Sequence, residues 1–223
     1  MEIKNLKITK KVVALALTGT LATAVLTGCG NMQIIDFNKS FNVAFETNNG
    51  YVSIVGIKEY SDYSGTQVQF VTEDNLRVLT STHQTQLLKS TDIDKINSYA
   101  LSLVGNNSDK IMDYNEMQGV SIDTSADAFN KDFIDWHFTY NKAIILTDDS
   151  ATIVNLTRWK DYEEDDKIQL QLEDGTYILT NIDNVKLIND EVAKDDSLSN
   201  YAISLVGDEN KVTIYEKPNQ KTK

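Results

Sequence analysis

The chain has 223 residues, a formal net charge of −12 at pH 7, one cysteine and one proline. A single cysteine excludes an intramolecular disulfide, so buried apolar side chains must stabilise the folded part. The acidic charge argues against binding to nucleic acid, and anionic lipid headgroups would repel it. The single proline, Pro218, excludes a proline-rich rigid stalk.

The N-terminal segment has the pattern of a signal peptide. Four lysines precede Val12–Leu26, a run of fifteen residues without a charge. As a helix this run would span only roughly 23 Å, which is less than the about 30 Å of a bilayer core. We therefore interpret it as the apolar region of a cleaved signal rather than as a membrane span.

The residues that follow, Leu26-Thr27-Gly28-Cys29, resemble the lipobox of bacterial lipoproteins. The resemblance implies that the signal peptide, residues 1–28, is removed and that Cys29 is the lipid attachment site, carrying diacylglycerol and palmitate. Acyl chains would then anchor the protein on the extracytoplasmic face of the cell membrane. The alternative is an ordinary secretory signal followed by an incidental or buried cysteine.

The rest of the chain contains an internal repeat. Ile34–Tyr114 aligns with Phe133–Tyr215 at offsets between 99 and 102, and Tyr99–Gly105 matches Tyr201–Gly207 at six of seven positions. We predict a tether at 29–33, a first copy at 34–116, a linker at 117–132, a second copy at 133–216 and a disordered tail at 217–223. Each copy is expected to fold alone.

Each copy has the pattern of a small β domain followed by a helix. Alternation in Val68–Val71 and Ile168–Leu172 predicts strands, and the turn residues Glu73–Asn75 and Glu173–Gly175 predict hairpins. Other strands are predicted at 52–60, 76–80, 86–88 and 110–112 and at 151–159, 177–180, 185–188 and 211–215, with loops at 61–66 and 160–166. The predicted fold is mainly β (β-rich α+β), with two tandem homologous antiparallel barrels or sheets that resemble an SH3-like barrel.

The helix of each copy is predicted from apolar spacing. Ile93–Val104 and Leu198–Val206 carry apolar residues at helical intervals. Gly105 and Gly207 are expected to end these helices in a left-handed conformation, and Ser197 is expected to cap the second one.

Three further sequence features carry a second resemblance. Gly30–Asp36, Trp159–Glu163 and Asp174-Gly175 are similar to the same positions in a group of small lipoproteins of Gram-positive bacteria. Members of that group are single units without an assigned biochemical role. The resemblance supports the localisation and the unit boundary, and it implies nothing about chemistry.

The sequence contains no catalytic motif that we can identify. The two histidines, His83 and His137, are not repeated between the copies, and no Gly-x-Ser-x-Gly turn occurs. We therefore predict a protein that is not an enzyme and that binds no cofactor. Weak candidates for a metal site are the clustered acids Asp161, Glu163, Glu164, Asp165 and Asp166. A solvated acidic loop is the simpler interpretation.

Aromatic residues are the candidate binding residues. Tyr60 and Tyr63 flank the predicted loop of the first copy, as Trp159 and Tyr162 do in the second, and Trp136 alternates with Phe138 and Tyr140. On SH3-like barrels, aromatics beside loops commonly line ligand grooves. Packing in the core is the alternative.

These features predict a lipid-anchored binding or scaffolding protein without catalytic activity, which recognises a protein, a peptide or a cell-envelope component. The alternative is a structural subunit of an envelope or conjugation-type complex, and a hydrolase is a distant third. An exposed aromatic groove in both copies would favour ligand binding, whereas an apolar patch in only one copy would favour assembly. A deep polar pocket would favour an enzyme.

Overall fold

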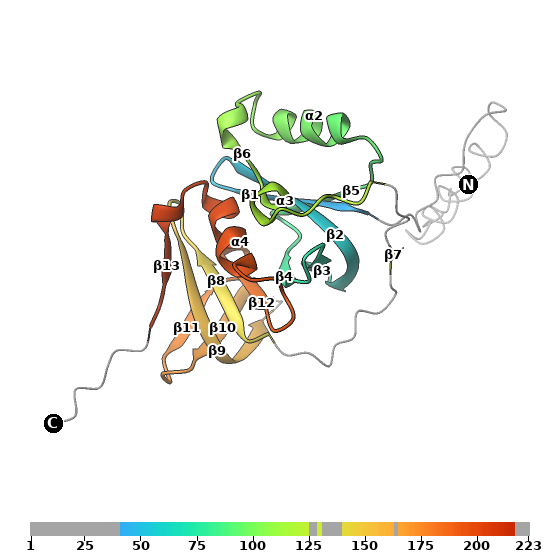
Figure 1. Ribbon diagram of the computed structural model, residues 1–223. Coiled ribbons are helices and arrows are strands. Elements are labelled where there is room, and N and C mark those ends of the chain that lie inside the picture. Colours follow the sequence, from blue (N-terminus) through green and yellow to red (C-terminus); the bar gives the residue numbers. More distant parts are fainter. Residues whose placement is uncertain (1–40, 125–128, 131–139, 163–164, 217–223) are drawn as a thin grey trace, which may run out of the picture. The chain divides into compact units, whose positions relative to one another are not determined.

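The computed structural model describes residues 41–124, 129–130, 140–162 and 165–216, without the side chains of 62–64 and 129–130. The signal peptide, Cys29, the tether and the tail lie outside these residues. Asn38–Lys223 forms one compact unit. The predicted class is confirmed, because the described fold is mainly β (Figure 1).

The first copy contains six strands and two helices. These are β1 (Val43–Asn48), β2 (Tyr51–Ser64), β3 (Gln67–Thr72), β4 (Arg77–Ser81), β5 (Thr85–Leu88), α2 (Ile93–Leu103), the 3₁₀ turn η1 (Ser108–Lys110), β6 (Ile111–Asp113) and α3 (Tyr114–Gln118). β7 (Phe129–Asn130) follows and pairs with β2. α3 extends two residues into the predicted linker, and Gln118 is buried.

The second copy repeats this succession. Its elements are β8 (Lys142–Leu146), β9 (Ala151–Tyr162), β10 (Lys167–Leu172), β11 (Tyr177–Asn181), η3 (Ile182–Asn184), β12 (Val185–Asn189), α4 (Ser197–Val206), η4 (Glu209–Lys211) and β13 (Val212–Ile214). The strand order is β4-β3-β2-β1-β5 in the first copy and β11-β10-β9-β8-β12 in the second. Strand by strand, the two orders correspond.

Turn chemistry explains the hairpins. At the β10–β11 turn, Gly175 has φ +87°, and the backbone N–H of Thr176 donates to the Asp174 carboxylate at 2.8 Å. Asn75 takes the same left-handed conformation in the first copy. The β1–β2 turn is Asn49-Gly50, with positive φ at both residues, which is the preferred two-residue hairpin turn.

Two local predictions need correction. The expected loops 61–66 and 160–166 begin later than predicted, because β2 continues to Ser64 and β9 to Tyr162. Ser197 is not the N-cap of α4: that position is Asp196, and the Ser197 hydroxyl lies 2.6 Å from the Lys194 carbonyl. Gly105 and Gly207 end their helices as predicted, with φ +61° and +74°.

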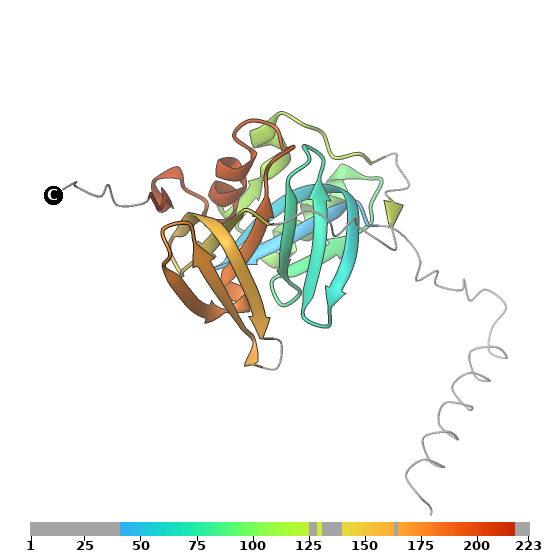
Figure 2. The ribbon, with the colours of Figure 1, turned by 90° about the horizontal axis from the view of Figure 1, so that it is seen from below.

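The two copies meet at one antiparallel strand pair, which we call the internal junction. β12 pairs with β4 (Figure 2). In this pair Leu187 lies opposite Leu79. The largest core cluster contains residues of both copies, including Phe70 and Val78 of the first and Ile144, Tyr201 and Leu205 of the second. The copies therefore share this central cluster, although each copy also has a smaller cluster of its own, around Phe45 and Ile96 in the first and around Ile168 and Leu170 in the second.

A buried ion pair crosses the internal junction. The Lys186 ammonium lies 2.5 Å from the Glu46 carboxylate and 2.6 Å from the Thr80 hydroxyl, while Thr85 donates to Glu46 at 2.9 Å. Both charged side chains are fully buried. A charge in this position is tolerated only with its partner and its hydrogen bonds in place.

Candidate functional site

The predicted aromatic residue of the first copy, Tyr60, lies in the core. It is 7% exposed, and its ring packs edge-on against Phe41 with centroids 5.3 Å apart. It pairs with Phe70 across the β2–β3 ladder. Tyr60 is therefore no longer a candidate binding residue.

In the second copy, Trp159 and Tyr162 lie on β9. Trp159 is half-buried against the core and packs edge-on against Tyr140, 6.0 Å between centroids. Its other side lines an open groove on the outer face of the strands, together with Arg158, Lys160, Gln169, Gln171 and Tyr177. Tyr162 donates to the Gln169 side-chain oxygen at 2.9 Å. This groove has no open counterpart in the first copy, where the equivalent residues Tyr60, Ser61 and Gln69 are buried.

Three of the predicted lipid-attachment and aromatic site residues lie outside what the structure describes. Cys29 and Trp136 lie outside the described residues, as does the side chain of Tyr63.

The acidic residues of the second copy are dispersed where they are described. Asp161 is half-buried on β9, Asp165 and Asp166 are exposed, and Lys167 lies 3.5 Å from Asp165. Glu163 and Glu164 lie outside the described residues. Within the described ranges, no three His, Cys, Asp or Glu side chains come together as metal ligands.

His83 lies at the internal junction beside its repeat equivalent, Asp183. Its Nδ1 is 3.2 Å from the Asp183 carboxylate, which also accepts a hydrogen bond from the Ser81 hydroxyl. In a hydrolytic triad the hydroxyl would instead donate to the imidazole. The geometry matches an inter-copy hydrogen-bond bridge.

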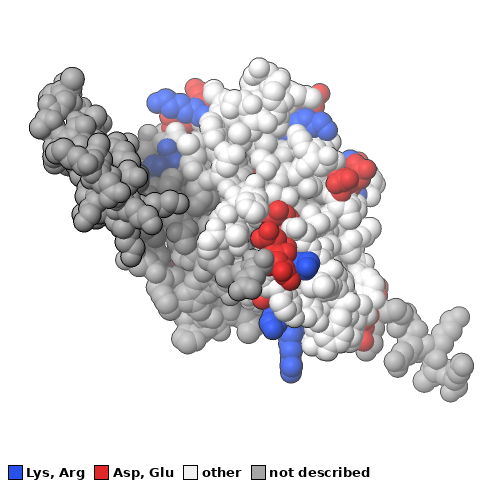
Figure 3. All heavy atoms as spheres, turned by 180° about the vertical axis from the view of Figure 1, so that it is seen from behind, with Lys and Arg blue, Asp and Glu red and all other residues white. Residues whose placement is uncertain are grey.

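Exposed apolar side chains gather on the second copy. On β11, at one end of the strand order, Tyr177 and Leu179 are 62% and 61% exposed. Ile214 and Tyr215, at the end of the described chain, are 65% and 39% exposed. We call Tyr177, Leu179, Asp174 and Tyr215 the tail face. Seen from behind the view of Figure 1, the described surface is mostly uncharged, with one group of acidic side chains near the centre (Figure 3).

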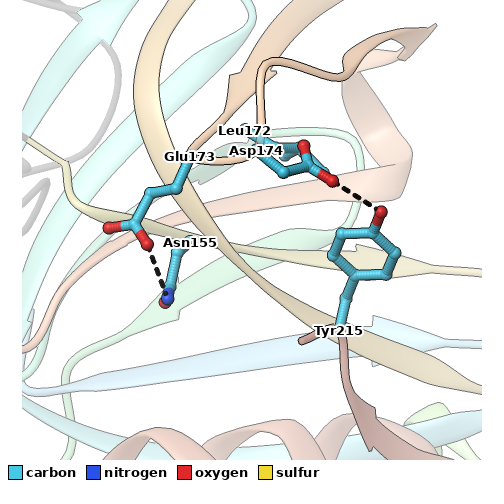
Figure 4. A pocket seen from close by; sticks show the side chains of 5 residues that line it. All are labelled: Asn155, Leu172, Glu173, Asp174 and Tyr215. Carbon is cyan, nitrogen blue, oxygen red and sulfur yellow. Dashed lines mark hydrogen bonds between the residues drawn. The ribbon is translucent and has the colours of Figure 1, made fainter. Parts of the chain in front are cut away.

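A hydrogen-bonded pair belongs to the tail face. The Tyr215 hydroxyl donates to the Asp174 carboxylate at 2.8 Å, and this hydrogen bond raises the pKa of Tyr215 (Figure 4). The hollow beside it, lined by Asn155, Leu172 and Glu173 as well, has a volume of about 20 Å³. That volume holds about one water molecule.

The first copy contains the same pair in a buried setting. The Tyr114 hydroxyl donates to Asp74 at 2.6 Å, and both side chains are covered by the second copy. Ser197 of α4 donates to the same Asp74 carboxylate, at 2.5 Å. Burial, and then the carboxylate, raise the pKa of Tyr114. One motif is therefore covered in the first copy and exposed in the second.

Comparisons with known proteins give no assignment. No protein-family model matches the chain, and no curated protein sequence is significantly similar to it. No helix within the described ranges is both long and apolar enough to cross a membrane.

Proposed function

We propose that this protein is a non-catalytic scaffolding protein, tethered by lipid to the extracytoplasmic face of the cell membrane, which binds a protein partner through its tail face. The lipobox-like residues before Cys29 support the tether. The acidic body supports a domain held away from anionic headgroups.

We also propose that each copy is an SH3-like barrel. The supporting observation is the shared strand order, in which the fifth strand returns beside the first and a short turn precedes it. In this proposal the strand faces, rather than a catalytic pocket, supply the binding surfaces.

The observation that carries the scaffolding function is the asymmetry between the copies. Leu179 is 61% exposed, whereas its repeat equivalent Leu79 is 1% exposed because the second copy covers it. Exposed apolar patches on soluble domains commonly mark interaction sites. A patch in one copy only favours assembly, and so supports the structural-subunit alternative, over a ligand groove repeated in both.

Photocrosslinking tests this proposal. A benzophenone amino acid at Leu179 of the full chain, in cells, is expected to give discrete crosslinked protein adducts. The matched control is Val192, which is 57% exposed and apolar but lies between β12 and α4. Equal adduct patterns from the two positions, or none from Leu179, would contradict a binding role for the tail face.

The tether has its own test. Cys29→Ser is expected to move the protein from the membrane fraction to the soluble fraction after the signal is cleaved, because acyl chains supply the membrane affinity. Immunoblotting of fractionated cells measures this. Wholly membrane-bound, cleaved Cys29→Ser protein would refute the lipid anchor.

A further inference from the structure

The internal junction joins two different surfaces. β4, the fourth strand of the first copy, pairs with β12, the fifth strand of the second copy. Each copy therefore has one surface of each type, and the junction uses only one of each. β11, the other fourth strand, and β5, the other fifth strand, stand at the two ends of the strand order, and no described strand pairs with their outer edges.

The side chains at these two ends are repeat equivalents of those covered at the internal junction. There, Tyr114 and Tyr201 pack edge-on with ring centroids 5.6 Å apart, and both are fully buried. The equivalent of Tyr114 is Tyr215 on the tail face, which is 39% exposed. The equivalent of Tyr201 is Tyr99 on α2, which is 38% exposed.

Two leucines buried at the internal junction also have more exposed repeat equivalents at the two ends of the strand order. Leu79 and Leu187 lie opposite each other at the internal junction, each 1% exposed. Their equivalents are Leu179 on β11 and Leu87 on β5, which are exposed and half-buried respectively. We call Leu87 and Tyr99 the head face.

The buried charges are also matched between the two ends. The equivalent of Glu46 is Ile145, and the equivalent of Lys186 is Gln86. Pairing the ends would therefore bring together an aliphatic side chain and a neutral amide. One member of the ion pair without the other would be costly to bury, but here both charges are absent together.

We propose that copies of this chain associate head to tail, with β11 of one molecule pairing antiparallel with β5 of the next. The association reproduces the internal junction, so Leu179 lies opposite Leu87 and Tyr215 packs on Tyr99. This inference rests on the proposed scaffolding function and names its partner. Because head and tail are different surfaces, association of this kind adds further copies and is not limited to a dimer.

The negative charge of the chain opposes this association, whereas tethering to a membrane favours it. Residues 1–28 carry four lysines and one glutamate, so the cleaved chain has a charge of −12 − 3 = −15. Repulsion between such copies weakens with salt, so association should strengthen between low and physiological ionic strength. A shared membrane surface raises the effective concentration and favours association further.

Disulfide trapping tests the head-to-tail contact. The full chain carrying Cys29→Ser has no cysteine, so Leu87→Cys and Leu179→Cys can be introduced alone or together. Under mild oxidation the double variant is expected to give a ladder of disulfide-linked oligomers on non-reducing gels. A mixture of the two single variants is expected to stop at the dimer, and each single variant alone to stay mostly monomeric.

The internal junction supplies a matched control. Leu79→Cys with Leu187→Cys occupies the same register within one chain and should form an intramolecular disulfide. No ladder from the Leu87/Leu179 double variant, when this control forms its disulfide, overturns the proposal. If the control variant does not form its disulfide, sedimentation of the Cys29→Ser chain tests the association instead. Concentration-dependent association that Leu179→Asp abolishes supports the proposal, and a monomer at all concentrations overturns it.

The outcomes also separate this inference from the proposed function. Adducts with other proteins at Leu179, without any ladder, would leave the scaffolding function standing and remove self-association. Loss of both would remove the tail face as a binding surface.

Discussion

The separated halves of this protein are expected to remain unfolded. Fragments 41–124 and 140–216 should each lack a cooperative thermal transition, which differs from the expectation that each copy folds alone. The reason is the shared core, in which Val78 and Phe70 pack in one cluster with Ile144, Tyr201 and Leu205.

The size of the effect follows from burial. Exposing one large apolar side chain costs about 1.5–3 kcal/mol, so exposing any four of these five side chains costs roughly 6–12 kcal/mol. Domains of this kind are stable by only about 5–15 kcal/mol in total. Circular dichroism during heating measures the transition.

Co-expression provides the control for the fragments. If the interlocked core is the cause, the two fragments produced together should form a complex that unfolds cooperatively. A cooperative transition in either fragment alone would instead show that the first interpretation, of two independent domains, was right.

Removing the buried ammonium is expected to destabilise the whole molecule. Lys186→Met should cost about 3–5 kcal/mol, because the Glu46 carboxylate would remain buried without its charged partner. The Thr85 hydroxyl would still donate to Glu46, but a neutral hydroxyl donor does not replace the positive charge of the ammonium. Chemical denaturation measures the loss.

A double variant separates the charge from the packing. Lys186→Met with Glu46→Leu should be more stable than Lys186→Met alone, since no unpaired charge remains. The control Lys142→Met, whose ammonium lies 4.0 Å from Asp190 at a partly exposed site, should change stability by under about 1 kcal/mol. A similarly small loss for Lys186→Met would contradict the importance of the buried pair.

Two features of the sequence indicate parts of this fold beyond the predicted strands and helices. Asn49-Gly50 between two apolar runs is a strong hairpin signal. It predicts a strand before Asn49, where the structure has β1. The exposed residues of β11 could have been suspected from the repeat itself, because Leu179 aligns with Leu79. No pattern in either copy distinguishes which of these two leucines is covered.

The sequence by itself determined the local structure. Alternation, turn residues and helix-ending glycines depend on short-range geometry, so strands, hairpins and helices were predictable, along with the correspondence of the two copies. The ends of the strands were not predictable from these patterns. Asp161 and Tyr162 continue β9 past the apolar run, because they pair across strands with Ile168 and Lys167.

Only the tertiary structure decided which residues form the core and which form the surface. Tyr60 and Trp159 are equivalent in sequence, yet one is buried and the other lines an open groove. Tyr114 and Tyr215 make the same hydrogen bond, and one of them is covered. For Tyr114 and Tyr215 the physical reason is that the two copies join through unlike surfaces. One set of equivalent positions is therefore buried between the copies, and the other remains exposed at the ends.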